Sequence, residues 1–290
     1  ALGQEDTEVV QSALSIGSIA NVQQIADRGA LTMPALALSG RRTSLAKLGG
    51  SALGAPFYQT TSTAATNAVA NAIIVNKPTG VQVGDLLLAF MSTANAIANS
   101  SSFFTTPAGW TLAAGGPFPT GQAVGTAVSF GFAVMYRIAD GTEGGTFTFA
   151  VTGGSGGNAE HIAIELHRIN GVNTAAPINA TATASLLATA LVPDPVSPSV
   201  TTTVTNCMVF SFLAHYHAAL SQSHTAPSGM IERADFECAV TATILGSTSD
   251  TVVFAAAGAT GTAVHDCTET VSTDAVMVRV AVAPGTQVLL

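Results

Sequence analysis

Charged residues are scarce in this sequence. Only 9% of its 290 residues are Asp, Glu, Lys or Arg, against roughly 25% in an average soluble protein. A free cytosolic monomer normally stays soluble through surface charge, so the composition favours a chain that packs within an assembly or stands outside cells. The formal net charge is −8, and a negative chain lacks the basic face that nucleic-acid binding needs.

Long apolar runs, cysteine frameworks and large aromatic side chains are scarce as well. The strongest apolar run, LLLAFM at residues 86–91, has the length of a strand and falls short of the roughly 20 residues of a membrane span. One Trp and three Tyr leave few rings for a sugar-binding platform. The three cysteines have no CxxC spacing, so they predict neither a disulfide framework nor a zinc site. They are expected to be small buried side chains, with one pairing left open, at Cys207, Cys238 and Cys267.

Residues 1–55 differ from the rest of the chain in composition and in the pattern of their apolar residues. Residues 5–29 begin with acids, end with Gly and fit a helical face loosely. The segment that follows holds Arg41, Arg42 and Lys47, three of the nine bases, among Gly and Ser. Such a segment cannot build its own core and gains order by lying on a partner. We predict an extended or partly helical N-terminal arm whose three bases serve attachment, with a plain linker as the alternative.

From residue 56 onward the pattern is that of β-strands. Residues 127–139, 144–153 and 160–169 place apolar side chains at every second position, as strands with a covered face do. Clusters of Gly, Pro, Asn and Ser separate these runs. The predicted fold class is an all-β antiparallel sandwich, jelly-roll-like, over residues 56–290.

The sequence also contains a degenerate internal repeat. TTPAGW at residues 105–110 returns as TAPSGM at residues 225–230, and apolar strand-like runs flank both copies in the same order. Within this order, residues 239–247 and 250–258 are predicted to be two successive strands. One continuous domain is therefore predicted, with a pseudo-symmetric sandwich made of half-units at about residues 70–170 and 199–284.

Each P-x-G corner is predicted to be a turn. Pro presets φ near about −65°, and Gly accepts a positive φ. The residue that follows can fold back as an apolar plug. The predicted turn and plug residues are Pro107, Gly109, Trp110, Pro227, Gly229 and Met230.

No catalytic motif stands out. The sequence has no HExxH, P-loop or GxGxxG after a strand. GGSGG at residues 153–157 matches the letters of GxSxG, but it connects two predicted strands with no helix after it, so it is no nucleophile elbow. No catalytic residue and no cofactor are therefore predicted. Asp235 and Glu237 come nearest to a carboxylate pair, as same-face neighbours on a predicted strand. His161, Glu165 and His167 share the face of another strand, which is expected to be solvated or to contact another subunit.

The remaining histidines raise the question of a metal. His215 and His217 project on the same side of a strand and could share an ion with His224 or His265 as a third ligand. No carboxylate stands near them in the sequence, so no metal is predicted. His215, His217 and His224 are instead expected to be polar contacts at one rim of the sandwich.

Several motifs resemble a known module when taken in order: KPTGVQVGDLLLAFM, TTPAGWTLAAGG, MYRIADGTEGGTFTF, LHRINGVNTAAPI and TAPSGMIERADF. Together they resemble a β-sandwich module of tailed bacteriophages, related forms of which occur in bacterial surface and secreted proteins. The resemblance covers about residues 70–284 and leaves residues 1–55 outside. It implies a virion structural protein (a tail fibre, a head or collar fibre, or a capsid decoration), usually oligomeric and often trimeric, with no catalytic residues to carry over. Met230 departs from the pattern, because the corresponding position in the first half, directly after the Gly of the corner, is Trp110.

The expected function is therefore that of a non-enzymatic phage virion protein at the particle surface. Its expected partners are other virion proteins, further copies of the chain and, as a candidate ligand, host surface polysaccharide. The absence of heptads and shaft repeats favours a short fibre, spike or decoration. The alternative is a secreted or cell-surface carbohydrate-binding module. A polysaccharide-cleaving enzyme that uses Asp235 or Glu237 is the third hypothesis.

Overall fold

The structure is a computed structural model that describes residues 54–66, 70–95, 102–115, 122–124, 129–153, 161–186, 194–217, 224–240, 243–267 and 274–286. Every regular element in this part of the chain is a β-strand, and neighbouring strands pair antiparallel. The predicted all-β antiparallel class is confirmed. No helix among these residues is long and apolar enough to cross a membrane. Residues 1–53 lie outside the described residues, as do the predicted attachment residues Arg41, Arg42 and Lys47.

The first half of the chain forms two sheets. The larger one, sheet 1, has the order β1-β9-β3-β7-β5, with β6 also paired to β7. Its strands are β1 (Phe57–Thr66), β3 (Leu86–Asn95), β5 (Thr111–Gly115), β6 (Gln122–Val124), β7 (Ser129–Ile138) and β9 (His161–Asn170). The smaller one, the first cover, has the order β2-β8-β4 and contains β2 (Ala72–Asn76), β4 (Ser102–Phe104) and β8 (Thr146–Gly153).

The second half of the chain likewise forms one large sheet and a smaller covering layer. Its large sheet, sheet 2, has the order β10-β20-β13-β16-β15, with β10 (Ile178–Leu186), β13 (Cys207–His217), β15 (Ile231–Val240), β16 (Thr243–Phe254) and β20 (Asp274–Val282). Three strand pairs, together called the second cover, take the place of a small sheet. They are β11 (Val196–Ser197) with β18 (Ala263–Val264), β12 (Thr201–Thr202) with β17 (Gly258–Ala259), and β14 (His224–Thr225) with β19 (Asp266–Cys267).

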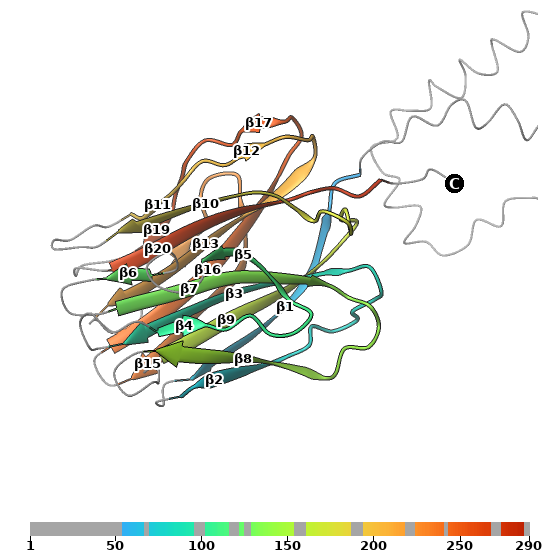
Figure 1. Ribbon diagram of the computed structural model, residues 1–290. Coiled ribbons are helices and arrows are strands. Elements are labelled where there is room, and N and C mark those ends of the chain that lie inside the picture. The colour runs from blue at the N-terminus through green and yellow to red at the C-terminus, as the bar shows by residue number, and fades with distance from the viewer. Residues whose placement is uncertain are drawn as a thin grey trace, which may run out of the picture. The chain divides into compact units, whose positions relative to one another are not determined.

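Sheets 1 and 2 pack face to face over the main core. Leu88 and Phe90 of β3 meet Phe210 and Phe212 of β13 in this core, and Phe90 stacks on Phe212 with ring centroids 4.6 Å apart. The described residues thus form a sandwich of two large sheets. The layers can be followed in Figure 1 from β2 and β8 at the bottom of the view to β12 and β17 at the top.

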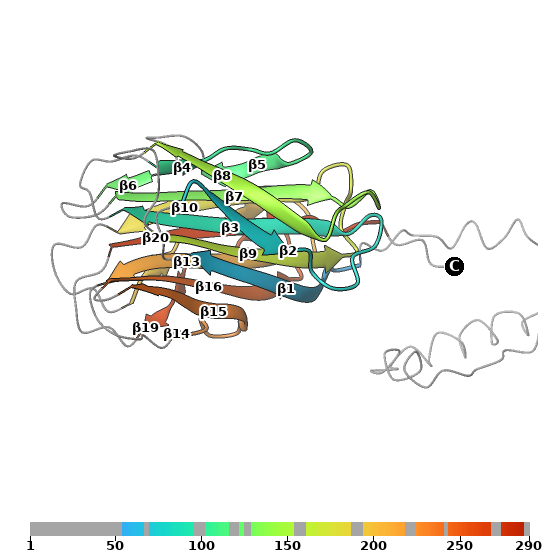
Figure 2. The ribbon, with the colours of Figure 1, turned by 90° about the horizontal axis from the view of Figure 1, so that it is seen from below.

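The opposite face of sheet 1 is covered too. Leu87, Ala89 and Met91 point from β3 toward the first cover, where they join Phe149 and Trp110 in a second apolar cluster. Figure 2 shows β2 and β8 of the first cover in front of the strands of sheet 1. Because both faces of β3 are buried, its sequence is a continuous apolar run and does not alternate.

The two large sheets share one strand order. In each, the first strand of the half forms an edge, the last strand pairs with it, and a long central strand follows: β1-β9-β3 in sheet 1 and β10-β20-β13 in sheet 2. The order continues with β7-β5 and with β16-β15. The shared order includes β1 and β10, which begin before the half-unit boundaries predicted near residues 70 and 199.

One strand prediction is wrong. The sequence predicts separate strands at residues 239–247 and 250–258, but the structure has the single strand β16, which pairs with β13 across both ranges. The polar stretch between them has the composition of a turn. It stays in the strand because its backbone pairs with β13 on one side and with β15 on the other, and Ser247 also donates a 2.7 Å hydrogen bond to Glu165.

Replacing Phe212 by Ala is expected to lower the free energy of unfolding by about 3–5 kcal/mol, because the change removes a fully buried ring and leaves a cavity. Phe57→Ala is the matched control. The Phe57 side chain is 51% exposed, so its loss is expected to change stability by about 0.5 kcal/mol or less. Urea denaturation followed by Trp fluorescence measures both, and equal losses would contradict a core between the two sheets.

Candidate functional site

The two P-x-G corners are built alike. In each, the residue after the Gly donates its amide to the Pro carbonyl, at 3.1 Å in the first corner and 2.9 Å in the second. The two glycines have φ angles of 79° and 81°, in the left-handed region that glycine adopts without a steric penalty. The residues concerned are Pro107, Gly109 and Trp110, and Pro227, Gly229 and Met230.

The two plugs have different surroundings. Trp110 is 8% exposed and meets Phe147 and Phe149 edge to face, at centroid distances of 5.4 and 4.9 Å. Met230 is only half-buried, and its Sδ lies 3.7 Å from Nη2 of Arg279. The first corner therefore closes an apolar core, and the second borders a polar layer.

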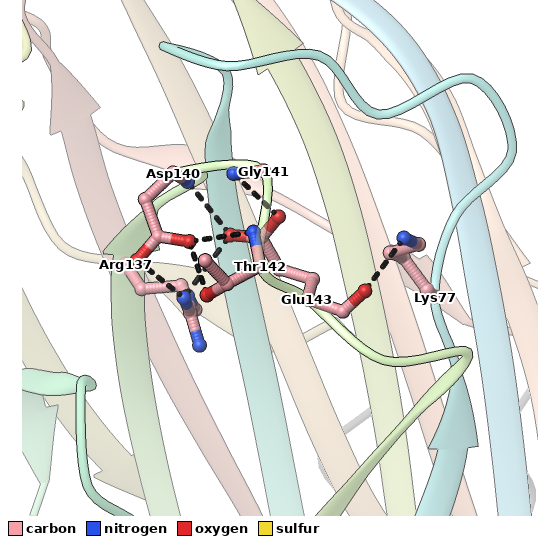
Figure 3. A network of polar contacts seen from close by, with 6 residues as sticks. All are labelled: Lys77, Arg137, Asp140, Gly141, Thr142 and Glu143. Atoms are coloured by element: carbon pink, nitrogen blue, oxygen red, sulfur yellow. Dashed lines mark hydrogen bonds and ion pairs between the residues drawn. The ribbon is translucent and has the colours of Figure 1, made fainter.

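A charged network shapes the loop between β7 and β8 (Figure 3). Glu143 accepts hydrogen bonds from Arg137 at 3.0 Å and from the amide of Asp140 at 2.8 Å. Lys77 donates to the Glu143 carbonyl at 3.0 Å. The Thr142 hydroxyl donates to Asp140 at 2.6 Å, and this bond lowers the pKa of Asp140. These charged groups bind one another, which indicates a structural role for the loop.

Polar side chains also lie between sheets 1 and 2. Glu165 accepts the hydrogen bond from Ser247, and its other oxygen lies 3.2 Å from Nε2 of His167. The Thr61 hydroxyl lies 2.6 Å from Nδ1 of the same ring. His161, Glu165 and His167 are all buried. The expectation of a solvated face or subunit contact for these three residues is therefore wrong, because sheet 2 covers this face.

A row of polar side chains crosses the outer face of sheet 2. Asp250 and Arg279 are the direct cross-strand neighbours of Ser211, and Glu232 is the neighbour of Asp250. Direct neighbours point to the same face of a sheet. Because Phe210 faces the main core, the adjacent Ser211 and its row face the second cover.

The second cover places two histidines against this row. His265 has its Nε2 2.8 Å from Oγ of Ser197 and 3.1 Å from Oγ of Ser211. Its Nδ1 lies 3.0 Å from Nε2 of His224. Oδ2 of Asp250 lies 3.4 Å from this Nδ1 and 3.5 Å from this Nε2. Three potential ligand atoms thus converge in what we call the buried triad, His224, Asp250 and His265.

Burial controls the ionisation of the buried triad. Asp250 and His265 are fully buried, and His224 is 9% exposed. Burial raises the pKa of Asp250 to about 7, although attraction to His224 opposes the rise. Burial lowers the pKa of His224 to about 4 and that of His265 to about 3, so both rings are neutral at pH 7. Two neutral imidazoles and a carboxylate are a donor set that suits transition-metal ions.

The histidines expected at a rim lie elsewhere. His215 and His224 are 3% and 9% exposed, so the interpretation of these two as exposed rim contacts is wrong. His224 lies on β14, within the second cover, and His215 lies on β13 on the same face as Ser211, the face that meets the second cover. The His217 side chain lies outside the described residues. Asp235 and Glu237 both lie on β15, the edge strand of sheet 2, with Asp235 exposed and Glu237 half-buried.

The polar layer also contains residues that the sequence did not single out. Asp250 belongs to a stretch whose composition is typical of a turn. Ser197 and Arg279 belong to segments that match no functional motif. Only the pairing of β13 with β16 and β20 makes them neighbours. The only signal in the sequence that could have pointed to this layer was Asp250, an acid in a segment predicted to be a covered strand. A buried acid needs partners, so its presence there implies polar neighbours.

A groove of about 720 Å³ lies beside the second corner, and Met230 and Arg279 contribute to its wall. Phe254 is the one aromatic residue among those that line it. Sugar sites commonly use an exposed aromatic platform, so this groove gives little support to the carbohydrate-binding alternative.

Comparisons of the chain with protein-family models, with curated proteins and with solved structures give no match. Function must therefore be argued from the residues and their arrangement.

The two plugs are expected to differ in their contribution to stability. Trp110→Ala should lower the free energy of unfolding by about 3–5 kcal/mol, whereas Met230→Ala should lower it by about 1–2 kcal/mol because that side chain is half-buried. Urea denaturation followed by far-UV circular dichroism compares them, since the first variant lacks the tryptophan signal. Equal losses would show that the two corners are energetically equivalent and contradict the difference in their surroundings.

Proposed function

We propose that this chain is a non-enzymatic structural protein of a bacteriophage particle. Residues 1–55 anchor it, and the stacked sheets project from the particle surface. It serves as a short tail fibre or spike in host adsorption, or as a capsid or collar fibre or decoration. Its partners are other virion proteins and further copies of the same chain, with a trimer expected from the phage-like motifs.

The observation that carries this proposal is the position of the phage-like motifs in the fold. LLLAFM is the doubly buried centre of sheet 1, and TTPAGW is the corner that places Trp110 beneath the first cover. TAPSGM occupies the matching corner before β15. The motifs are thus the framework of the sandwich, as expected for a module that serves as a scaffold.

Two sheet edges support association with further copies. β1 and β10 are the edges of sheets 1 and 2, and their sequences FYQTTSTAAT and INATATASL contain no charge and no proline. None of their described side chains is buried, and each strand has a bulge only near its start. Edge strands of monomers are usually protected by charge, proline or bulges. These edges therefore offer backbone groups to a neighbouring subunit.

An antibody against residues 70–284 is expected to label intact phage particles from the source of the chain in immunogold electron microscopy. Label at the tail tip would identify adsorption apparatus, and label over the head or collar would identify a fibre or decoration there. Deleting residues 1–53, which precede the described sandwich, should abolish co-sedimentation with particles and leave the β-type circular dichroism spectrum unchanged.

Two results would contradict these expectations. If no particle carries label and the full chain binds polysaccharides on an array, the secreted or cell-surface carbohydrate-binding module replaces the virion proposal. If the chain without residues 1–53 still co-sediments with particles, these residues are not the anchor.

Charge on the two edges is expected to weaken self-association. Ala65 of β1 and Thr183 of β10 are exposed, so lysine at both positions should repel a neighbouring strand and leave the core intact. Sedimentation velocity of the full chain should show an oligomer for the parent and a smaller species for the double variant. Thr105→Lys, at an exposed position outside the strands, is the control. A monomeric parent, or an oligomer that survives the double change, would argue against the edges as contacts.

A further inference from the structure

We propose that His224, His265 and Asp250 bind one transition-metal ion of the Zn²⁺ class, which fastens the second cover to sheet 2. The site would be structural and independent of the attachment role. The sequence offered His224 and His265 only as alternative third ligands beside His215 and His217, because the three ligands lie far apart in the chain, on β14, between β18 and β19, and on β16. The proposal rests on four features of the triad.

The first feature is the spacing of the three ligand atoms. Nδ1 of His265 and Nε2 of His224 lie 3.0 Å apart, and Oδ2 of Asp250 lies 3.4 and 3.5 Å from them. In a tetrahedral site with bonds of about 2.0–2.1 Å, neighbouring ligand atoms stand about 3.3–3.4 Å apart. The three atoms therefore already form one face of a tetrahedron of the right size, which leaves the fourth position to a water molecule.

The second feature is the carboxylate itself. Asp250 is 0% exposed, and neither of its side-chain oxygens has a hydrogen-bond partner among the described residues. Burying a carboxylate without partners is strongly unfavourable. A divalent cation between Oδ2 and the two imidazole nitrogens would supply the missing positive charge.

The third feature is the hydrogen-bond support behind the His265 ring. Histidine ligands usually hold their second nitrogen in a hydrogen bond, which selects the tautomer and orients the ring. Nε2 of His265 has this support from Ser197 at 2.8 Å and from Ser211 at 3.1 Å. When Nε2 carries the proton, Nδ1 keeps its lone pair for a metal. Nδ1 of His224 has no hydrogen-bond partner among the described residues, and Oε2 of Glu232 lies 3.7 Å from it.

The fourth feature is the contrast with the other half of the chain. The first cover is held to sheet 1 by an apolar cluster that includes Met91, Phe149 and Trp110. The second cover consists of strands only two residues long. Its Cys267 and the adjacent Val200 join small apolar clusters with Leu213 and Val209 of β13, beside the polar row. These clusters are smaller than the one under the first cover, so a bound ion would add to the apolar contact that holds the second cover.

The donor set also selects the ion. Imidazole suits Zn²⁺ and its transition-metal neighbours, whereas Mg²⁺ and Ca²⁺ prefer oxygen ligands. Three protein ligands and one water are the coordination usual at catalytic zinc sites, but all three ligands here are buried, which favours a structural role.

Zn²⁺ titration of the full chain after chelator treatment tests the proposal. Isothermal titration calorimetry should give one equivalent of bound Zn²⁺, and saturation should raise the melting temperature by about 5 °C. Mg²⁺ should do neither. Co²⁺ should give the intense visible absorption of a tetrahedral site, and Zn²⁺ should abolish it.

Three variants locate the site. Asp250→Asn keeps the shape and removes the buried charge, so it should fold at least as well as the parent without metal. Asp250→Asn and His265→Gln should each weaken Zn²⁺ binding more than about 100-fold, and Ser197→Ala by about 10–100-fold, as the loss of an outer partner does. Asp266→Asn removes a carboxylate next to His265 that is exposed on the opposite side of the strand, and it should bind as the parent does.

The proposal is overturned if the full chain binds no Zn²⁺, or if Asp250→Asn retains parental affinity. A loss in Asp266→Asn equal to that in Asp250→Asn would also overturn it. The same holds for a weak, octahedral-type Co²⁺ spectrum, which would indicate binding at surface groups. Because Asp250→Asn is expected to fold, a failure of His265→Gln to fold would leave the test intact.

Discussion

Burial of both faces of both large sheets is the constraint on which the rest of this structure depends. Sheets 1 and 2 use one face each to build the main core around Phe90 and Phe212. A sheet that is apolar on its second face would be unstable in water, so each sheet needs a further layer. The first and second covers meet this need, and with them the chain becomes a stack of antiparallel layers.

The two halves meet the constraint by different chemistry. Under the first cover, apolar side chains from the three strands of the cover and from sheet 1 cluster with Trp110, and removal of apolar surface from water stabilises the layer. Under the second cover, small apolar clusters around Val209 and Leu213 lie beside a polar row that meets histidines and a serine of the cover. Buried polar groups stabilise a fold only when all of them have partners. This layer is therefore the place where a bound ion would have the largest effect.

The four outer edges of the large sheets also differ. β15 carries Glu232, Arg233, Asp235 and Glu237, and β5 is only five residues long, so charge and shortness protect these two edges. β1 and β10 are long and uncharged. With charged residues limited to 9% of the chain, such edges are consistent with a protein that works beside further copies of itself.

The sequence by itself determined the all-β class of the fold and the positions of its two P-x-G corners. Alternation along the chain, the LLLAFM run and the two P-x-G corners are local signals, and each depends on residues within about ten positions of one another. Only the tertiary structure decided that β16 is one strand, that His161, Glu165 and His167 are buried, and that Asp250 meets His224 and His265. The reason is that strand periodicity is a local property, whereas the register between distant strands and the path of a covering loop depend on the packing of the whole core.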